Sequence, residues 1–147
     1  MVNSEVLLVE DNPHDAQLFL LALKKKGLES HVYVVKDGAE AIDFLFARGK
    51  YEERKLSSRL KVVFLDLKLP KLNGFEVLEE IRKSPEFKTL PVVMHSSSAV
   101  EADVKNAYRL GANSYVVKPI DFKLHAEHMT HAVEYWRNVN NTPGTYK

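Results

Sequence analysis

The chain has 147 residues, and its charges nearly balance, because 21 Lys and Arg residues against 20 Asp and Glu residues leave a net charge of +1. This length suits one domain that buries about two thirds of the surface its unfolded chain exposes. The balance argues against a general nucleic-acid or membrane surface, and the absence of Cys excludes a disulfide framework, a thiolate metal site and a cysteine nucleophile. Without a signal-peptide pattern or an apolar run near about 18 residues, the sequence predicts a soluble cytoplasmic protein.

Short apolar runs, rich in Val and Leu, alternate along the chain with longer segments of helical period. The apolar runs are predicted strands, at residues 6–9, 32–35, 62–65, 91–94 and 115–117. The segments of helical period are predicted helices, at about 13–27, 39–47, 74–84, 100–110 and 122–138. Five strands alternating with five helices predict an α/β protein with a doubly wound (βα)5 fold, in which helices cover both faces of a five-stranded parallel sheet.

The whole chain, residues 1–147, is predicted to be a single domain with a core at about 5–138 and a short C-terminal tail at 139–147. No internal repeat and no second domain is evident. The one long connection, RGKYEERKLSSR at 48–59, is rich in charge and is expected to be exposed.

Polar side chains follow four of the five predicted strands. The stretch KVVFLD ends a buried strand in a carboxylate, which costs desolvation energy unless something nearby offsets it. Because the C-terminal ends of parallel strands share one edge of the sheet, these side chains should converge there. They are Glu10, Asp11, Asp66, Ser96 and Lys118.

Such a cluster suits metal-assisted phosphoryl chemistry. Carboxylates brought close together raise one another's pKa unless a cation intervenes, and carboxylate oxygens and water are the ligands that Mg²⁺ prefers. Asp66 is the candidate nucleophile toward a phosphoryl group, because it follows a central, buried strand. Lys118 and the Ser96 hydroxyl are side chains of the kind that hold the transferred oxygens.

Four stretches together resemble the receiver domain of two-component response regulators: VLLVEDNP, FLDLKLPKLNG, VVMHSSS and SYVVKPI. The resemblance covers about residues 5–138 and implies a flavodoxin-like (βα)5 fold and a signalling protein rather than an enzyme. It also implies Mg²⁺ dependence and transfer of a phosphoryl group from a histidine kinase to Asp66. By the same resemblance, Asp11 binds the metal directly, Glu10 binds it through water, and the backbone carbonyl of Lys68 is a further ligand.

The resemblance also assigns the residues that respond to the phosphoryl group. Ser96 matches the switch hydroxyl, Tyr115 the switch aromatic side chain, and Lys118 the lysine that pairs with the phosphoryl group. The peptide bond between Lys118 and Pro119 is expected to be cis by this resemblance, although only about 5–6% of X–Pro bonds in folded proteins are cis.

The segments VEYWRNVNNTPGTY and GKYEERK are similar to stand-alone receivers that partner bacterial phytochromes. That resemblance implies a phytochrome-type histidine kinase as partner and a homodimer formed through the fourth helix, fifth strand and fifth helix. Only 26 residues follow Asp121, so we expect output through protein contact rather than through DNA. Tyr135 and Trp136 are candidate interface anchors, with packing onto the protein's own sheet as the alternative.

The sequence is also compatible with other functions. An intermediate phosphorelay carrier and a chemotaxis-type stand-alone regulator share the same motifs. A hydrolase of the dehalogenase-like class would need a second Asp two residues after Asp66, where Lys68 stands. A flavin-binding module would need a Ser, Thr or Gly phosphate loop after the first strand, where EDNPHD supplies acids instead.

Two residues near the site bear on the rate of dephosphorylation. Lys68 and Ser98 flank, by resemblance, the route of the water that hydrolyses the phosphoaspartate, so the long Lys68 side chain predicts slow autodephosphorylation.

His95 is expected to pack on the face opposite Ser96. The histidines at 125, 128 and 131 are expected to be partly exposed polar positions, because a metal site there would need an additional ligand.

Overall fold

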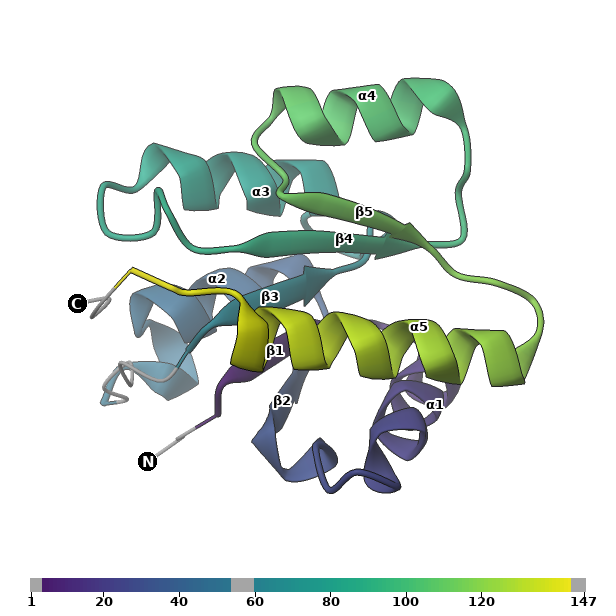
Figure 1. Cartoon of the computed structure of the whole chain (residues 1–147). Helices are drawn as coiled ribbons and strands as arrows, with labels where there is room; N and C mark the ends of the chain where they lie inside the picture. Colours follow the sequence, from purple (N-terminus) through teal and green to yellow (C-terminus); the bar gives the residue numbers. More distant parts are fainter. Residues whose placement is uncertain (1–3, 54–59, 144–147) are drawn as a thin grey trace.

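All five apolar runs form strands of one parallel sheet in the computed structural model, which describes residues 4–53 and 60–143. The strand order is β2-β1-β3-β4-β5, so β1 and β3 lie at the centre (Figure 1). The strands are β1 (Val6–Val9), β2 (Val32–Val35), β3 (Val62–Leu65), β4 (Val92–Ser96) and β5 (Ser114–Val117). The predicted (βα)5 fold is therefore confirmed, with the first three strands at their predicted bounds.

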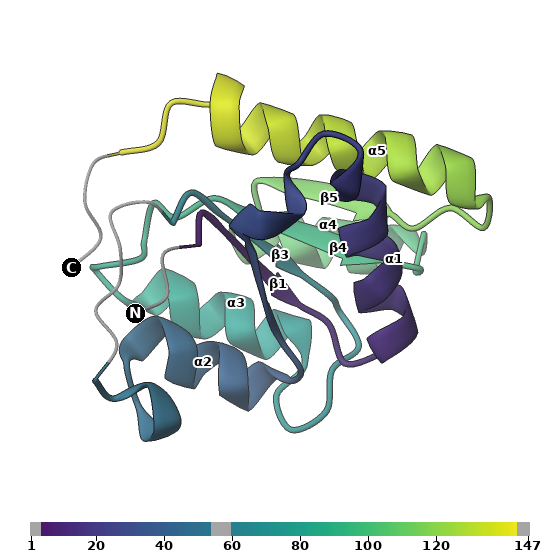
Figure 2. The ribbon, with the colours of Figure 1, turned by 90° about the horizontal axis from the view of Figure 1, so that it is seen from below.

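Helices cover both faces of this sheet. They are α1 (Pro13–Lys24), α2 (Gly38–Phe46), α3 (Gly74–Lys83), α4 (Glu101–Arg109) and α5 (Phe122–Glu134). Figure 2 shows α1 and α5 together on one face and α2 and α3 on the other. Two apolar clusters fill the space between sheet and helices, and β1 and β3 send alternate side chains into each. The central strands are buried on both faces, which explains their continuous apolar sequence.

The chain after α5 differs from the prediction. The α-helix ends at Glu134 and continues as one π-helical turn, Tyr135–Val139, rather than as an α-helix to residue 138. The Asn140 N–H closes this turn on the Tyr135 carbonyl oxygen at 2.7 Å. Arg137 forms an ion pair with Glu5, and Lys61 Nζ donates to the Arg137 carbonyl oxygen at 2.9 Å. These contacts tie the turn to the N-terminal edge of the sheet.

The sequence predicts that the long connection after α2 is exposed, but the structure buries one of its residues, Tyr51. A short 3-10 turn, Gly49–Tyr51, brings the Tyr51 ring into a buried position against Phe44, with ring centroids 5.2 Å apart. The Tyr51 hydroxyl donates to Glu40 at 2.8 Å, so burial leaves it satisfied. Residues 54–59 of this connection lie outside the described residues. Among the described helices, none is long and apolar enough to span a membrane.

Candidate functional site

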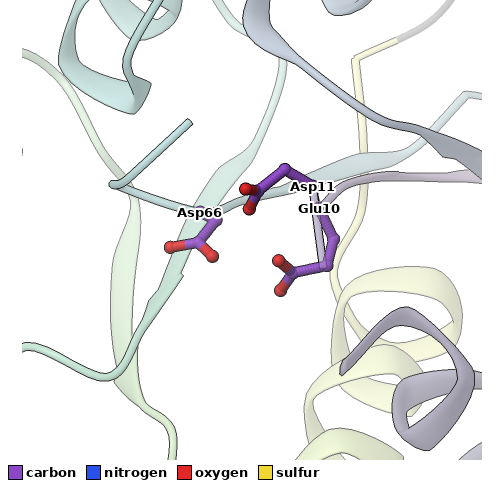
Figure 3. Close-up of side chains that lie close together, drawn as sticks. All are labelled: Glu10, Asp11 and Asp66. Atoms are coloured by element: carbon purple, nitrogen blue, oxygen red, sulfur yellow. The ribbon is translucent and has the colours of Figure 1, made fainter. Parts of the chain in front are cut away.

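Three carboxylates meet at the C-terminal edge of the sheet. Glu10 and Asp66 directly follow β1 and β3, and these strands pair in register, with Val9 opposite Leu65. One oxygen of each carboxylate in the set Glu10, Asp11 and Asp66 lies within 4.8 Å of the others (Figure 3). Glu10 and Asp66 are buried, whereas Asp11 is exposed. The predicted convergence of these acids is confirmed, and an all-oxygen set of this kind fits a hard divalent cation.

The side chain of Lys118 reaches into this acidic cluster from the end of β5. Its Nζ atom lies 2.5 Å from Glu10 Oε1, 3.1 Å from Asp66 Oδ2 and 3.5 Å from Asp15 Oδ2. The Lys118 side chain is only 13% exposed, so water screens these contacts weakly. Its backbone N–H donates to the Ser96 carbonyl oxygen at 2.7 Å, which holds the start of the loop against β4.

Burial and charge oppose each other in this cluster. Burial raises the pKa of Glu10 to about 7, because the hydrogen bond and charge of Lys118 only partly offset desolvation. Burial alone would lower the pKa of Lys118, but its hydrogen bond with Glu10 and the charge of Asp66 outweigh burial and raise that pKa. Lys118 therefore stays positively charged at neutral pH and is the cation that the buried acids face.

A tight loop fixes Asp66 between β3 and α3. The Lys68 N–H donates to Asp66 Oδ1 at 3.3 Å, so each oxygen of this carboxylate has a donor. Gly74 starts α3 directly against the loop, and a Cβ there would lie 2.3 Å from the Asp66 carbonyl oxygen. Asn73 caps the helix in a reciprocal capping box with Glu76. The stretch LPKLNG thus sets the position of the carboxylate as well as the start of the helix.

The two predicted switch residues both contact Ser98. The buried Ser96 hydroxyl oxygen accepts from the Ser98 N–H at 3.1 Å, and the half-buried Tyr115 donates its hydroxyl to the Ser98 carbonyl oxygen at 2.8 Å. The Ser98 hydroxyl in turn donates to Asp103 in the first turn of α4 at 2.6 Å. The loop after β4 therefore links Ser96, Tyr115 and α4 through one residue.

The expected cis bond before Pro119 is wrong. Every peptide bond among the described residues is trans, including that between Lys118 and Pro119. The trans form is the default, favoured by about 0.5–1 kcal/mol in X–Pro bonds. Lys118 reaches both Glu10 and Asp66 with this bond trans, so these contacts do not require the cis isomer.

Asp15 belongs to the site although the sequence did not single it out. It lies in the first turn of α1, where the Asn12 side chain caps the helix and accepts from the Asp15 N–H at 3.2 Å. This cap directs the first turn toward the strand ends and so toward Lys118. The available signal was the capping pattern DNPHD, in which an acid three residues after the cap reads as ordinary helix-dipole stabilisation.

The histidines divide into buried and exposed ones. His95 is buried as predicted and packs edge-on against Phe19, with ring centroids 5.7 Å apart. His125 is also buried, contrary to the expected exposed position, because it shares the inward stripe of α5 with Met129 and Val133. The two remaining histidines of α5, at 128 and 131, are exposed.

The two aromatic interface candidates have different surroundings. Trp136 is partly buried and packs against the apolar cluster beneath α1 and α5. Tyr135 is 47% exposed, and its ring stands edge-on to that of Trp136 with centroids 5.1 Å apart. Trp136 therefore packs partly onto its own domain, which was the alternative to an interface role. Tyr135 is the more accessible of the two rings.

A doubly wound parallel sheet with acids, a hydroxyl and a lysine at its C-terminal edge defines a class of phosphoryl-accepting signalling domains. The family model of the response regulator receiver domain matches residues 6–130 of this chain, so the chain belongs to this family. Acceptance of a phosphoryl group in the presence of a divalent metal is characteristic of the family.

The chain is similar to response regulators of known structure, two of which are described as phytochrome response regulators. The chain is 39% identical over 118 residues to response regulator Rcp1 of Synechocystis sp., covering 80% of this chain and 78% of Rcp1. The Mn²⁺-bound structure of Rcp1 matches with a TM-score of 0.84 at 34% identity, over 95% of this chain and 98% of that one. The structure of the phosphorylated cyanobacterial phytochrome response regulator RcpA matches with a TM-score of 0.87 at 34% identity, over 96% and 99%. The bacteriophytochrome response regulator RtBRR is 44% identical, with a TM-score of 0.72 over 94% and 82%.

The buried histidines predict a stability that falls in weak acid. Burial holds the pKa of His95 well below its usual range and lowers that of His125. Below about pH 6.5 both rings therefore bind a proton in the unfolded chain but not in the native protein. Each pKa unit by which the folded value lies below the unfolded value removes up to about 1.4 kcal/mol from the free energy of unfolding as the pH falls. Urea unfolding from about pH 7.5 to about pH 5.5 should show a smaller loss of stability in His125→Gln than in the wild type.

The matched control is His128→Gln, which changes an exposed histidine one turn further along the same helix. It should keep the wild-type pH dependence. Equal pH dependence in the wild type and His125→Gln would contradict the assignment of acid sensitivity to the buried ring.

Proposed function

We propose that Asp66 accepts a phosphoryl group from a histidine kinase and that Mg²⁺ is the divalent metal that assists. The observation that carries this proposal is the convergence of Glu10 and Asp66 on the Lys118 ammonium, with Asp11 beside them. Side chains of Glu10, Asp11 and Asp66, together with the Lys68 carbonyl, would hold the ion. The ion supplies charge neutralisation for the carboxylates and the incoming phosphoryl oxygens.

The protein's own groups orient the reaction. An Asp66 oxygen forms the new bond to phosphorus as the bond from phosphorus to the kinase imidazole nitrogen breaks, and the electron pair leaves with that nitrogen. The Lys68 N–H and Lys118 Nζ already hold the two carboxylate oxygens in place, which lowers the entropic cost of attack. Lys118 would then bind a transferred oxygen as a fixed positive charge.

Ser96 and Tyr115 would report the new state of Asp66. When the Ser96 hydroxyl turns to donate to a phosphoryl oxygen, it gives up the hydrogen bond that it accepts from the Ser98 N–H. Ser98 also accepts from Tyr115 and donates to Asp103, so a shift of this residue changes the setting of the aromatic ring and of α4. Phosphorylation would then bias a two-state element rather than create a new fold.

The direct test is the intact mass of the protein after incubation with Mg²⁺ and acetyl phosphate. The wild type should gain one phosphate that is stable in acid and lost in base, and Asp66→Asn should gain none. Asp15→Asn is the matched control, because it changes a neighbouring carboxylate that also contacts Lys118 but leaves the nucleophile in place. Equal labelling of wild type and Asp66→Asn would refute the assignment.

Lys68 is predicted to prolong the phosphorylated state. Its amide is held against Asp66, which anchors the start of a long side chain beside the route of a hydrolytic water. Lys68→Ala should shorten the half-life of the phosphoaspartate severalfold, as followed by intact mass after removal of the donor. Lys71→Ala, which changes an exposed lysine of the same loop, should leave the half-life unchanged. A half-life that lengthens in Lys68→Ala would show that the side chain promotes hydrolysis.

We further propose that the partner is a phytochrome-type kinase. The support is the likeness to Rcp1, RcpA and RtBRR over most of this chain and most of each relative. A phosphorelay carrier and a chemotaxis-type regulator would use the same acid cluster, so the partner distinguishes them. We also propose that this exchange takes place in the cytoplasm, in keeping with membership of the receiver-domain family.

Output through a homodimer, rather than through DNA, completes the proposal. The face formed by α4, β5 and α5 carries exposed apolar side chains, among them Tyr108 at 49% and Val117 at 37%, and Tyr135 adds an exposed ring just beyond α5. Such rings are common anchors of protein interfaces.

Tyr135→Ala should therefore shift a dimer toward monomer in light scattering while leaving phosphorylation intact. Leu21→Ala is a suitable control, because Leu21 is similarly exposed, at 54%, but lies on α1, which is not one of the elements of this face. A dimer that is weakened by Leu21→Ala and not by Tyr135→Ala would place the interface elsewhere.

A further inference from the structure

Asp15 contacts the ammonium group of Lys118 but has no part in the phosphoryl transfer proposed for Asp66. The three N–H bonds of an ammonium can serve three acceptors, and three carboxylates lie around this one. Its Nζ atom lies 2.5 Å from Glu10, 3.1 Å from Asp66 and 3.5 Å from Asp15. These acids belong to separate parts of the fold, since Glu10 follows β1, Asp66 follows β3 and Asp15 lies on α1. The lysine is therefore shared among three partners.

Asp15 differs from the other two partners of Lys118 in its relation to the metal. Among the residues that the structure describes, the acids whose oxygens group closely enough to hold an ion are Glu10, Asp11 and Asp66 (Figure 3). Asp15 is not one of them. A divalent cation bound there draws on the carboxylates of Glu10 and Asp66, which are the two closest partners of the ammonium. Lys118 and the metal therefore compete for the same carboxylates.

The start of α1 fixes the position of Asp15. Asn12 caps this helix, and its side-chain oxygen accepts from the Asp15 N–H at 3.2 Å. The Asp15 side chain is 39% exposed, so its carboxylate keeps part of its hydration while it faces the lysine. A carboxylate in the first turn also interacts favourably with the helix dipole, which is the ordinary role of such an acid. A role in the dipole alone would affect the stability of α1 and not the metal site.

The surroundings of Lys118 leave space on the side of α1. A cavity of about 90 Å³ lies beside both side chains, and its lining includes Asp15, Lys118 and the rings of His95 and His125. Burial lowers the pKa of both rings, so they are neutral at neutral pH and add no positive charge beside the ammonium. Asp15 is therefore the acid toward which the lysine can turn when a metal takes the other two.

We propose that Asp15 is a positioning residue that holds Lys118 when Mg²⁺ occupies the acidic cluster. By pairing with the ammonium, Asp15 reduces the competition between the lysine and the ion for Glu10 and Asp66. The affinity for Mg²⁺ then depends on Asp15, although this side chain is not a ligand of the ion. Because Asp66 keeps its place in Asp15→Asn, that variant still gains one phosphate at saturating Mg²⁺. The inference rests on the proposed Mg²⁺ site, which Mg²⁺ binding by the wild type tests separately.

The experiment is a double-mutant cycle in which titration calorimetry measures the affinity for Mg²⁺. Asp15→Asn should bind Mg²⁺ about threefold to tenfold more weakly than the wild type, because the lysine then stays on the carboxylates that the ion needs. In the Lys118→Gln background the same change should weaken binding less than about twofold, since no ammonium competes there and salt screens the exposed charge. Glu101→Gln removes an exposed first-turn acid of α4 and should bind as the wild type does.

Three results of the cycle would overturn the proposal. An equal loss of affinity in both backgrounds would show that Asp15 acts on the ion only as a distant charge. Equal affinity of Asp15→Asn and the wild type would leave the helix dipole as the role of this acid. A wild type that binds no Mg²⁺ would overturn the proposed metal site and this inference together.

A second measurement needs no variant of Lys118 and so stays decisive if Lys118→Gln folds poorly. The ¹⁵N resonance of the Lys118 side chain reports how fast its ammonium hydrogens exchange with water. At saturating Mg²⁺ this exchange should be faster in Asp15→Asn than in the wild type, because the ion takes the two closest acids and the third is gone. Equal exchange rates in the two Mg²⁺-loaded proteins would also overturn the proposal.

Discussion

One ammonium group holds the C-terminal edge of this sheet together. Lys118 follows β5, yet its Nζ atom contacts Glu10 beyond β1 and Asp66 beyond β3. Without it, two buried carboxylates would face each other across adjacent strands, and removing one partner of a buried ion pair typically costs about 3–5 kcal/mol. The same charge that makes the acids tolerable in the fold is the charge that would receive a phosphoryl group. The contacts of Lys118 with Glu10 and Asp66 are therefore important both for the fold and for the proposed function.

Strand β4 connects this edge to both layers of helices. Successive side chains of a strand point to opposite faces, so Ser96 turns toward the loop that leads to α4 and His95 turns toward α5. On the first face Ser98 joins Ser96 to Tyr115 and Asp103; on the second, the His95 and His125 rings meet beside the cavity lined by Asp15 and Lys118. Neighbouring residues of one strand, His95 and Ser96, thus face the two layers of helices.

The sequence predicted the parts of the molecule that follow from pattern. Continuous apolar runs marked the buried strands, and the strand ends marked Glu10, Asp66 and Lys118. Side chains whose role depends on tertiary position were missed or misplaced. His125 was grouped with the other histidines at spacings of three, whereas the buried stripe of α5 runs at spacings of four through Met129 and Val133. Asp15 read as an ordinary first-turn acid. Burial of Tyr51 was not predicted from its charged stretch, because neither its edge-on ring contact with Phe44 nor its hydrogen bond to Glu40 is visible in local sequence.

The role assigned to Lys118 is tested most directly by titration calorimetry, which compares the Mg²⁺ affinity of the Lys118→Gln variant with that of the wild type. If the ammonium offsets the carboxylates of Glu10 and Asp66, its removal leaves more negative charge for the metal, and Lys118→Gln should bind Mg²⁺ more tightly. Affinity that is unchanged or weaker in Lys118→Gln would contradict the account, because it would mean that the lysine does not govern the charge of the acidic cluster.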